Sequence, residues 1–428
     1  MSKSAEKRNI VVVGGGFAGT TVARHLQDRL PPGYALVLVS EESYTTFNPM
    51  LPEAMGASIF PEHVVAPLRE ILDMRAGHRF VMGRVTEIDA VQQTLSCASL
   101  AGNTQIGYAH LILAFGNRAR LDFIPGMAEH ALPLKTVGDA MEIRNSVLRR
   151  LAAMELEADA AKRRLLGQFL VVGGGFSGVE VAGELIDCLH SIQRYYPHAQ
   201  PREIGVTLVH DGARLLPELP PRLGAAALHS LRQRGVQVLL NTGATEISAL
   251  GVRLRSAELL PGATVICTIG TRPNSLTQSL GLSLERGRIV TRADMRVAEH
   301  TGLWALGDCA LVPNAHDGQP APPTAQFAVQ QAGQLADNLL RQIRGTATRP
   351  FSHQARGSMA AIGHMKGVAQ VFGLGLSGLP AWLLWRAYYL SLMPTWGRKL
   401  RIFVEWSWGM FFPADITHLR FVRSRDQG

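Results

Sequence analysis

Apolar residues in this chain gather in short β-branched runs that alternate with longer stretches of helical period. The runs at residues 10–13 and 170–172 each lead directly into a glycine-rich turn. Apolar positions at helical spacing follow both turns, and a further apolar run follows each helix, over residues 34–39 and 204–209. A strand, a turn, a helix and a second strand form a βαβ unit with parallel strands. The pattern therefore predicts an α/β fold in which this unit occurs twice.

The first glycine-rich turn has the spacing G-x-G-x-x-G, at Gly14, Gly16 and Gly19. In such a turn the first glycine permits a tight bend, the second lets the backbone approach a pyrophosphate, and the third lets helix and strand pack closely. The helix that follows offers free N–H groups to the phosphates. An acid about 20 residues further on binds a ribose hydroxyl, and Glu41 lies 22 residues past Gly19. This segment predicts a dinucleotide site that includes the turn residues Phe17 and Ala18.

The second turn repeats the spacing at Gly173, Gly175 and Gly178, with Phe176 and Ser177 between them. The first glycines of the two turns lie 159 residues apart, which is the length of one domain. We therefore expect two Rossmann-like domains and two dinucleotides, one a tightly held flavin and the other a diffusible nicotinamide.

The strand after the second turn ends at His210 and Asp211, where NAD sites often carry an acid. His210 at the ribose position leaves the donor preference open, because Asp211 can reach a 2′-hydroxyl and Arg214 can accommodate a 2′-phosphate. We expect NADH to be preferred over NADPH.

Composition excludes several other classes of protein. Of 428 residues, 46% are hydrophobic and 18% are charged, which excludes a disordered or fibrous chain. The net charge of +9 comes from scattered arginines without a recognition motif, so nucleic-acid binding is not expected. The four cysteines are far apart and form no CxxC, so we expect neither a metal site nor a dithiol reductase. Residues 1–9 are polar and charged, and we expect no export signal.

Four further motifs narrow the assignment. They are the apolar runs that end in glycine at residues 111–116 and 265–270, the Gly-Asp element at 303–308, and the helix at 324–333 with the pattern A-Q-x-A-x-Q. Together with the two turns, these motifs resemble type II NADH dehydrogenases, which belong to the two-dinucleotide-binding-domain flavoproteins. The resemblance extends over roughly residues 9–420, and the Ala-Gln helix is its most specific part.

The resemblance implies a single-subunit enzyme that passes electrons from NADH, or NADPH, through FAD to a membrane quinone without pumping protons. It implies a discontinuous FAD domain at residues 1–117 and 274–350, an inserted NAD(P)H domain at 118–273, and a membrane-associating region at 351–428. From the basic charge and the C-terminal aromatic residues described below, we expect a peripheral enzyme at an anionic lipid surface, on the cytoplasmic face of the inner (plasma) membrane. A homodimer is left open.

The resemblance also implies roles for individual residues. It assigns Glu180, Gln326 and Gln330 to catalysis. Lys366 precedes the apolar run over residues 368–376 and is a candidate for the quinone region, with a surface lysine as the alternative. Glu180 would lie beside the nicotinamide, although an acid in the first turn of a helix is also a common structural feature. The N-terminus of the 324–333 helix would stabilise negative charge on the flavin ring. Besides the two turns and their acids, the residues expected to contact the cofactors are Thr46, Asn48, Pro49, Val85, Ala114, Gly116, Gly270, Gly307, Asp308 and Ala325.

Two other functions remain open on the sequence. Cys309 follows Asp308 directly, and sulfide:quinone reductases use cysteines near the flavin. A persulfide relay needs at least two placed cysteines, so we interpret Cys309 as a buried structural thiol. The second alternative is a redox-responsive flavoprotein with slow turnover.

The C-terminal part of the chain holds five of the six tryptophans within 27 residues. We expect a helix over residues 379–393 with a broad face that includes Trp382, Leu383, Tyr389 and Leu390, followed by an apolar stretch over 400–412. The helix would be about 22 Å long and too short to span a bilayer core of about 30 Å. Its aromatic residues, with Arg386, Arg398, Lys399 and Arg401, suit a membrane interface. The alternative is an ordinary core or oligomer contact.

Overall fold

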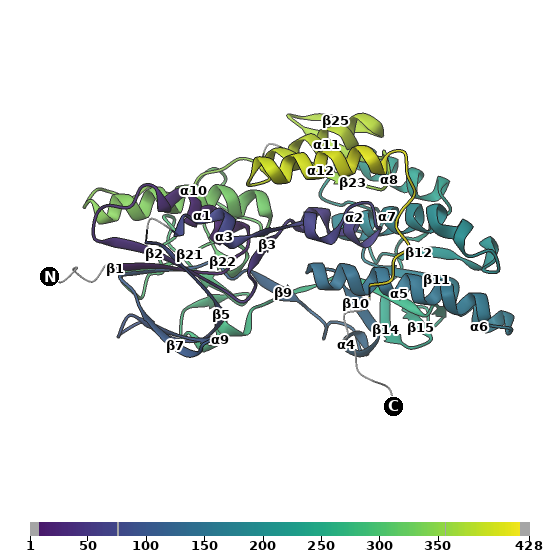
Figure 1. The fold of residues 1–428 in the computed structure, drawn as a ribbon, viewed down its shortest axis with the longest axis horizontal. Coiled ribbons are helices and arrows are strands. Elements are labelled where there is room, and N and C mark those ends of the chain that lie inside the picture. Colours follow the sequence, from purple (N-terminus) through teal and green to yellow (C-terminus); the bar gives the residue numbers. More distant parts are fainter. Residues whose placement is uncertain (1–7, 75–76, 356, 420–428) are drawn as a thin grey trace. The chain divides into compact units, whose positions relative to one another are not determined.

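The structure is a computed structural model that describes residues 8–74, 77–355 and 357–419. Within these residues the chain forms two compact units. The first comprises Met1–Thr46, Val65–Arg118 and Thr271–Ala355, and the second comprises Phe47–Val64, Ala119–Gly270 and Arg356–Gly428. Each unit contains a parallel sheet with helices (Figure 1), so the predicted α/β fold is confirmed.

The first unit is built on a seven-stranded sheet of order β21-β8-β1-β2-β5-β6-β7. Its first five strands are parallel, and β6 and β7 extend it as an antiparallel meander. The strands are β1 (Arg8–Val13), β2 (Tyr34–Ser40), β5 (Arg79–Asp89), β6 (Thr94–Ser99), β7 (Gly102–Gly107), β8 (His110–Leu113) and β21 (Leu303–Ala305). The side chains of β1, β2 and β8 are almost all buried, as expected for strands covered on both faces.

Two helices from distant parts of the sequence pack against each other in this unit. Helix α1 (Phe17–Gln27) follows β1 directly, and α10 (Ala325–Ile343) lies beside it (Figure 1). Helix α10 begins where the sequence predicts, because the Thr324 hydroxyl accepts a hydrogen bond from the Phe327 amide at 3.4 Å. Smaller elements complete the unit: β3 (Tyr44–Thr46), β4 (Val65–Pro67), α3 (Leu68–Ile71), α9 (Ser275–Ser279), β19 (Leu284–Glu285), β20 (Arg288–Val290), η6 (Gly307–Cys309) and β22 (Ala310–Leu311).

One predicted boundary in this unit is wrong. The sequence suggests a short strand over residues 80–83, with Arg84 and Val85 after it. In the structure β5 continues to Asp89, and both residues lie inside the strand, opposite Ala98 and Cys97 of β6. The strand runs on because β6 provides antiparallel partners beyond Gly83, which a local apolar pattern does not reveal.

The second unit contains a five-stranded parallel sheet of order β10-β17-β11-β12-β13. The strands are β10 (Ala131–Pro133), β11 (Gln168–Val172), β12 (Gly205–Val209), β13 (Gln237–Leu239) and β17 (Thr264–Cys267). Helix α7 (Phe176–Ile192) follows β11, as α1 follows β1 in the first unit. The other elements are α4 (Met127–His130), α5 (Val137–Leu156), α6 (Ala160–Gly167), α8 (Pro221–Gln233), and a small antiparallel sheet of β14 (Ala244–Ser248), β15 (Gly251–Leu254) and β16 (Leu259–Pro261).

The second unit also gathers two outlying parts of the sequence. The segment Phe47–Val64 contributes η1 (Asn48–Met50), α2 (Leu51–Met55) and η2 (Pro61–His63), and α2 packs against α5 and α7. The C-terminal part forms a three-stranded antiparallel sheet and two helices that run beside each other, α11 (Leu379–Leu392) and α12 (Trp396–Gly409) (Figure 1). The strands are β23 (Gly357–Ala361), β24 (Gly367–Val371) and β25 (Leu374–Ser377).

The predicted orientation of helix α11 is wrong at two positions. Trp382 is 1% exposed because α11 packs against β24, and Trp385 and Trp406 are buried as well. Arg386 points inward, with its guanidinium carbon 3.6 Å from the ring centre of Trp382. Three of the five C-terminal tryptophans therefore belong to the core, whereas Trp396 and Trp408 are exposed.

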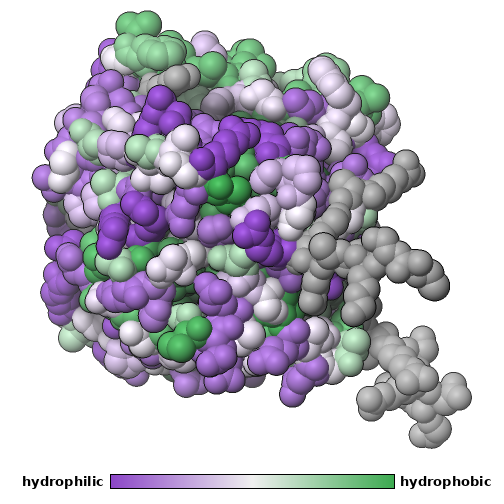
Figure 2. All heavy atoms as spheres, turned by 90° about the vertical axis from the view of Figure 1, so that its left-hand side faces the viewer, coloured by the Kyte–Doolittle hydropathy of each residue, from purple (hydrophilic) through white to green (hydrophobic). Residues whose placement is uncertain are grey.

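In the described part of the chain, no helix is long and apolar enough to cross a membrane. Figure 2 shows one face of the molecule, on which hydrophilic residues prevail and hydrophobic residues are scattered. Such scatter is normal for a protein surface. A row of exposed apolar residues on one face of a helix would differ from this scattered pattern.

Candidate active site

The first glycine turn is shaped by contacts that exclude any larger residue. Gly14 has φ +115°, and a Cβ built there would lie 2.3 Å from the carbonyl oxygen of Ala114. A Cβ on Gly19 would lie 1.9 Å from the carbonyl oxygen of Gly14, so helix α1 touches the turn directly. Gly16, the N-cap of α1, has no atom within 4 Å of its missing Cβ. The turn thus leaves open space at the helix N-terminus, which fits a pyrophosphate.

Four parallel strands of the first unit end at the same edge of the sheet. Gly14 follows β1, Glu41 follows β2, Ala114 follows β8, and Gly307 comes two residues after β21. A Cβ on Gly307 would lie 3.2 Å from the Cβ of Ala18, which places the Gly-Asp element directly against α1. Phe17, Gly116 and Asp308 each lie within a few residues of these positions. The structure therefore brings most of the predicted flavin residues to one edge.

Glu41 is already engaged in this structure. Both carboxylate oxygens accept hydrogen bonds from Nη2 of Arg118, at 2.8 and 2.9 Å, and Nε of Arg84 lies 3.8 Å from Oε1. All three side chains are largely exposed, so these contacts contribute little to stability. A ribose hydroxyl would share the carboxylate with these two arginines. Val85, the other residue predicted on this side, is buried in β5.

The Ala-Gln helix makes one contact to the Gly-Asp element that its sequence motif does not predict. Ala325 and Gln326 form the first turn of α10, Gln330 is exposed one turn later, and Gln331 is 1% exposed. The side-chain oxygen of Gln331 accepts the Gly307 N–H at 2.8 Å. This bond ties the Gly-Asp element to α10. Gln331 is the second glutamine of a Gln-Gln pair, and neighbouring residues of a helix do not share a face, so it points to the core while Gln330 is exposed.

The predicted flavin loop is divided between the two units. Thr46 ends β3 in the first unit, whereas Asn48 and Pro49 form the first turn of η1 in the second. Phe47 is 5% exposed, and its amide donates to the carbonyl oxygen of Val64 at 2.8 Å. The two ends of the segment 47–64 are therefore held together by a backbone hydrogen bond.

The second glycine turn repeats the geometry of the first. Gly173 has φ +120°, and a Cβ on Gly178 would lie 1.8 Å from the carbonyl oxygen of Gly173. Gly175 is the N-cap of α7 and has no atom within 4 Å of its missing Cβ. Phe176 and Ser177 begin α7, and Gly270 follows β17, the neighbour of β11. The second unit therefore offers the same kind of open phosphate cradle.

The ribose edge of this second site carries a histidine. His210 directly follows β12, and its Nδ1 accepts the Gly174 N–H at 3.2 Å. Asp211 is 71% exposed, with Oδ1 3.3 Å from Nδ1 of His210. Arg214 donates to the carbonyl oxygens of Pro217 and Leu219, at 2.7 and 3.3 Å, and thereby braces its own loop. Two of the three predicted ribose-recognition residues thus lie together, and the third is engaged by backbone.

Three glutamates of the second unit are buried next to one another. Glu180 and Glu184 lie one turn apart on α7, and Glu53 lies on α2, which packs against α7. They are 8%, 3% and 2% exposed. Burial raises the pKa of Glu180 well above its ordinary range, and burial with the nearby Glu53 raises the pKa of Glu184 to about 8. Burial therefore favours the protonated form in this cluster, and Glu184 holds at neutral pH a proton that an exposed glutamate would release.

The C-terminal helices supply the partners of Glu53. Arg386 of α11 lies 3.4 Å from Oε1, and the indole N–H of Trp406 on α12 donates to Oε2 at 2.9 Å. Burial raises the pKa of Glu53, and the charge of Arg386 opposes that rise. Oε1 of Glu180 accepts the Ala361 N–H at 3.3 Å, and the Ser58 hydroxyl donates to Glu184 at 2.9 Å. The sequence reasoning singled out only Glu180, because glutamates on short apolar helices carry no local sign of burial.

The profile of the pyridine nucleotide-disulphide oxidoreductases matches residues 8–332, most of the chain. The chain belongs to this family. Its member NdhA of Mycobacterium tuberculosis, a type II NADH:quinone oxidoreductase, is 29% identical over 95% of this chain and 87% of its own length. The demethylphylloquinone reductase NdbB of Synechocystis is 31% identical, over 93% of this chain and 95% of its own. The predicted resemblance to type II enzymes is confirmed by these relatives.

Structural comparison supports the same fold. The NDH2 structure from Plasmodium falciparum superposes with a TM-score of 0.89 at 18% identity, covering 96% of this chain and all of that one. A sulfide:quinone oxidoreductase from Aquifex aeolicus gives a TM-score of 0.69 at 16% identity. At these identities the likeness concerns the fold alone.

The name of this oxidoreductase family refers to a disulphide, but the cysteines of this chain form no redox-active pair in the structure. All four cysteines lie in the described residues, and each is a buried free thiol. The Cys309 thiol donates weakly to the carbonyl oxygens of Leu306 and Leu113, at 3.2 and 3.4 Å, and burial raises its pKa to about 12. A thiol held this way is a poor nucleophile. The interpretation of Cys309 as a structural residue agrees with this geometry.

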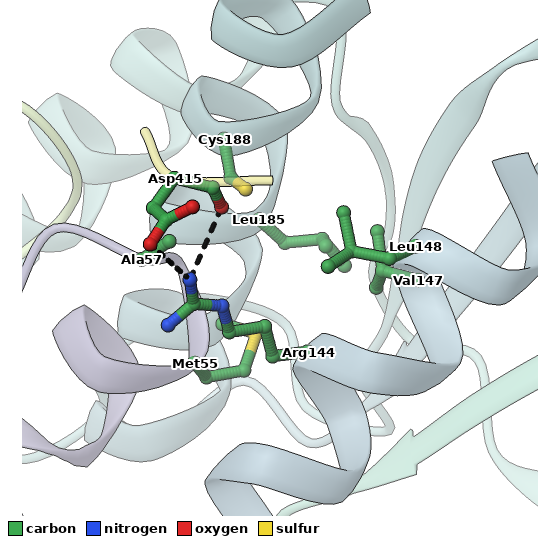
Figure 3. A pocket seen from close by; sticks show the side chains of 8 residues that line it. All are labelled: Met55, Ala57, Arg144, Val147, Leu148, Leu185, Cys188 and Asp415. Carbon is green, nitrogen blue, oxygen red and sulfur yellow. Dashed lines mark hydrogen bonds and ion pairs between the residues drawn. The ribbon is translucent and has the colours of Figure 1, made fainter. Parts of the chain in front are cut away.

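Two further features of the second unit are the surroundings of Lys366 and a small cavity. Lys366 lies in the turn between β23 and β24, where its ammonium donates to the carbonyl oxygen of His364 at 3.1 Å. A cavity of about 10 Å³ lies between α2, α5, α7 and the C-terminal segment (Figure 3). Arg144 lines it and donates to the carbonyl oxygen of Asp415 at 3.1 Å. The cavity has room for a single water and not for a substrate.

Proposed function

We propose that this protein is a single-subunit, non-proton-pumping NAD(P)H:quinone oxidoreductase that uses FAD. The observation that carries the proposal is the pair of open phosphate cradles, at Gly16 and Gly175, on two separate parallel sheets. Two relatives of nearly equal length bear the names of quinone reductases. The balanced reaction is NADH + H⁺ + quinone → NAD⁺ + hydroquinone. FAD, when bound, accepts hydride from the nicotinamide and delivers two electrons to the quinone.

We assign the FAD site to the first glycine turn and the strand ends beside it. The α1 N-terminus would hold the pyrophosphate, with Gly307, Asp308 and the first turn of α10 completing the site. Helix α10 begins with a threonine cap and has no acid in its first turn, so its positive end is not neutralised. We propose the discontinuous FAD domain at residues 1–117 and 274–350. The first compact unit covers most of these residues, but the segment 47–64 belongs to the second unit.

We assign the second glycine turn to the nicotinamide donor. The α7 N-terminus would hold the pyrophosphate, and His210 and Asp211 would lie at the adenosine ribose. Glu180 lies one turn into α7, and burial raises its pKa, which favours the protonated form that could give a proton to the reduced product. Gln326 and Gln330 can hydrogen-bond without adding a titrating group. The role of Lys366 in the quinone region remains a further proposal.

We also propose that the enzyme works on a membrane surface. Helix α12 exposes Trp396, Leu400, Phe403, Val404 and Trp408, which are 56–84% exposed and recur at helical spacing. Leu379 and Leu383 of α11, Leu374 of β25 and Phe372 before it are exposed as well. Arg401 is exposed on α12, where it can meet anionic lipid. A lipophilic quinone would then be reached from the bilayer, with the protein peripheral on the cytoplasmic face.

The sulfide:quinone alternative is disfavoured by the buried thiols and their raised pKa values. Anaerobic titration of the flavin-loaded protein separates the remaining candidates. We expect NADH to bleach the flavin absorbance with a stoichiometry of one, and a soluble quinone to restore it within milliseconds to seconds. Bleaching without restoration by any quinone would favour the slow redox-responsive protein, and no bleaching by NADH or NADPH would refute the proposed donor.

A further inference from the structure

Residues 413–419, which we call the C-terminal strap, lie against α5 and α7 without regular secondary structure. Three side chains of these helices bind its backbone: Arg144 and Asn145 donate to carbonyl oxygens, and the Ser191 hydroxyl accepts an amide. The strap residues bound are, in the same order, Asp415 at 3.1 Å, Leu419 at 3.0 Å and Ala414 at 3.0 Å. The strap is therefore held through main-chain atoms.

Arg144 carries a charge that is buried beneath the strap. Its side chain is 4% exposed, whereas its carboxylate partner Asp415 is 42% exposed, with Oδ2 3.6 Å from Nη2. Among the described residues, Nε of Arg144 is buried and finds no hydrogen-bond partner. A buried N–H without a partner is costly, and an ordered water is its usual partner where the protein supplies none.

The structure has room for such a water at this place. Arg144 lines the cavity of about 10 Å³ between α2, α5, α7 and the strap (Figure 3). The thiol of Cys188 and the carboxylate of Asp415 line it as well, so a water there would have the polar partners that it needs. Asp415 and, to a lesser degree, Ala57 are the lining residues that reach solvent. The strap therefore covers the outer side of the cavity.

The inner side of the cavity adjoins the carboxyl of Glu184. The residues on either side of Gly56 line the cavity, and Gly56 itself lies against Glu184, since a Cβ there would be 3.1 Å from Oε2. The hydroxyl of Ser58 donates to the same Oε2 at 2.9 Å. Leu185, the next residue to Glu184 on α7, lines the cavity too. A single layer of residues thus separates the cavity from this carboxyl.

The proposed reaction gives these buried carboxyls a reason to exchange protons. It consumes one proton for each quinone reduced, and a buried acid that supplies it must regain it from solvent. Glu184 lies one turn from Glu180 on α7, and its charge, after burial, helps to raise the pKa of Glu180. The other titratable or charged groups that face Glu184 are Glu53 on α2, Asp187 and Cys188 on α7, and Arg386 on α11.

We propose that the cavity holds the water through which Glu184 regains its proton from solvent, and that the strap with Arg144 restricts this exchange. The inference rests on the proposed function, in which Glu180 serves the quinone and Glu184 resupplies Glu180. In the step, hydronium gives a proton to the Glu184 carboxylate through the cavity water and the Ser58 hydroxyl, and a water remains. The strap excludes bulk water and the charge of Arg144 opposes hydronium, so Glu184 keeps its proton between turnovers.

The first test loosens the strap and needs no turnover. Asn145→Ala combined with Ser191→Ala removes two of the three bonds and changes no residue that lines the cavity. Water should then reach Glu184 and lower its pKa toward that of an exposed glutamate. The melting temperature of the flavin-loaded native protein should fall from pH 5 to pH 9, and in the double variant this fall should shrink by about half.

Glu184→Gln supplies the background that separates a proton effect from a loss of packing. In that background the double variant should lower the melting temperature equally at every pH, because no carboxyl remains at residue 184 to titrate. A strap with a purely structural role would lower the melting temperature equally at every pH in both backgrounds. That result would overturn the proposal.

The second test changes the volume of the cavity. Val147→Ile adds a methyl group, about the size of one water, to a lining residue, and Val147→Ala enlarges the cavity. Stopped-flow mixing with a pH indicator records proton uptake, and flavin absorbance records reduction by NADH. We expect Val147→Ile to slow proton uptake and hydroquinone formation at least about threefold while flavin reduction keeps its rate, and Val147→Ala to slow neither.

Native rates of proton uptake in a folded, flavin-loaded Val147→Ile would overturn the proposed route. If the native protein reduces no quinone, the proposed function fails. The melting temperatures of the first test then still decide whether the strap controls the protonation of Glu184.

Discussion

The glycines of the two turns differ in the physical reason for their small size. Gly14 and Gly19 are fixed by backbone contacts below 2.5 Å to a hypothetical Cβ, so any side chain there would disrupt the fold. Gly16 and Gly175 face open space, and a side chain there would disturb only what fills that space. The second kind of position can therefore test ligand binding without unfolding the protein.

Gly16→Val is expected to give folded protein without flavin. The valine side chain would enter the space at the α1 N-terminus and displace the pyrophosphate. The amount of FAD bound should therefore fall several-fold or to zero. The measurement is the ratio of flavin to protein absorbance after purification, with circular dichroism to verify folding. Gly107→Val is the matched control, since its Cβ also meets open space but on an edge strand. A full flavin spectrum in Gly16→Val would refute the placement of FAD.

Gly175→Val should weaken the nicotinamide donor and leave FAD bound. The same steric argument applies at the α7 N-terminus, in the other unit. We expect the KM for NADH to rise at least tenfold, about 1.4 kcal/mol, in steady-state assays at saturating quinone. If this variant instead loses flavin and keeps its affinity for NADH, the two sites have been assigned in reverse.

At the scale of elements, the packing of α2 against α7 makes stability depend on pH. Glu184 of α7 faces Glu53 of α2, and other charged groups around it are Asp187 on α7 and Arg386 on α11. Burial raises its pKa to about 8, so the folded protein keeps a proton that the unfolded chain releases near pH 4.3. The folded state binds more protons between these values, and its stability falls as pH rises through the interval.

Glu184→Gln is expected to flatten this dependence. The amide cannot ionise and can still accept a hydrogen bond from Ser58, so the variant should be more stable than the native protein at pH 9. The native slope attributable to this group is at most about 1.4 kcal/mol per pH unit. Thermal unfolding between pH 5 and 9 gives the comparison. Glu246→Gln, at an exposed ion pair with Arg253, is the control. Parallel curves for Glu184→Gln and the native protein would contradict the expected linkage.

Helix α12 has two faces with different tasks. Ile402 and Trp406 are buried, and Glu405 forms an ion pair with His63 and accepts the Phe60 amide, so this side anchors the helix to the segment 47–64. The other side is the row of exposed apolar residues from Trp396 to Trp408. One helix therefore connects the proposed membrane face to the segment that carries Glu53.

At the scale of the whole molecule, truncation after Leu376 is a poor test of membrane binding. It would remove Trp382, Trp385 and Trp406 from the core, together with Arg386, the cation beside Glu53. Loss of that cation leaves a buried carboxyl without its partner, which is strongly destabilising. A truncated protein could thus leave vesicles because it unfolds.

The sharper test replaces exposed side chains only. Leu400→Gln, Phe403→Gln and Trp408→Gln combined should release the flavin-loaded protein from vesicles containing anionic lipid, by tenfold or more in partition coefficient. NADH should still bleach the flavin, while reduction of long-tailed quinones falls. The control combines Val91→Gln, Leu100→Gln and Leu156→Gln, which are more exposed than the three test residues but scattered elsewhere. If both triple variants co-sediment with vesicles equally, the α12 face does not bind the membrane and would instead serve in protein contacts.

Local signals determined much of what could be known from the sequence alone. The strand, glycine turn and helix at residues 8–27 and 168–192 follow from contacts within a few residues, so the α/β fold and both phosphate cradles could be predicted. The Thr324 cap of α10 is local in the same sense. The match to the family extends over residues 8–332 and includes all of these segments.

Tertiary structure alone decided which side chains are buried and what they meet. Tryptophan and arginine are residue types that are common at a membrane interface. Trp382 and Arg386 are nevertheless buried, because they pack against β24 and α2. Glu53 and Glu184 are ordinary glutamates until two helices distant in sequence bring their carboxyls together. Val85 stayed in its strand because β6 paired with it. Burial and pairing depend on partners far along the chain, and a local pattern cannot specify them.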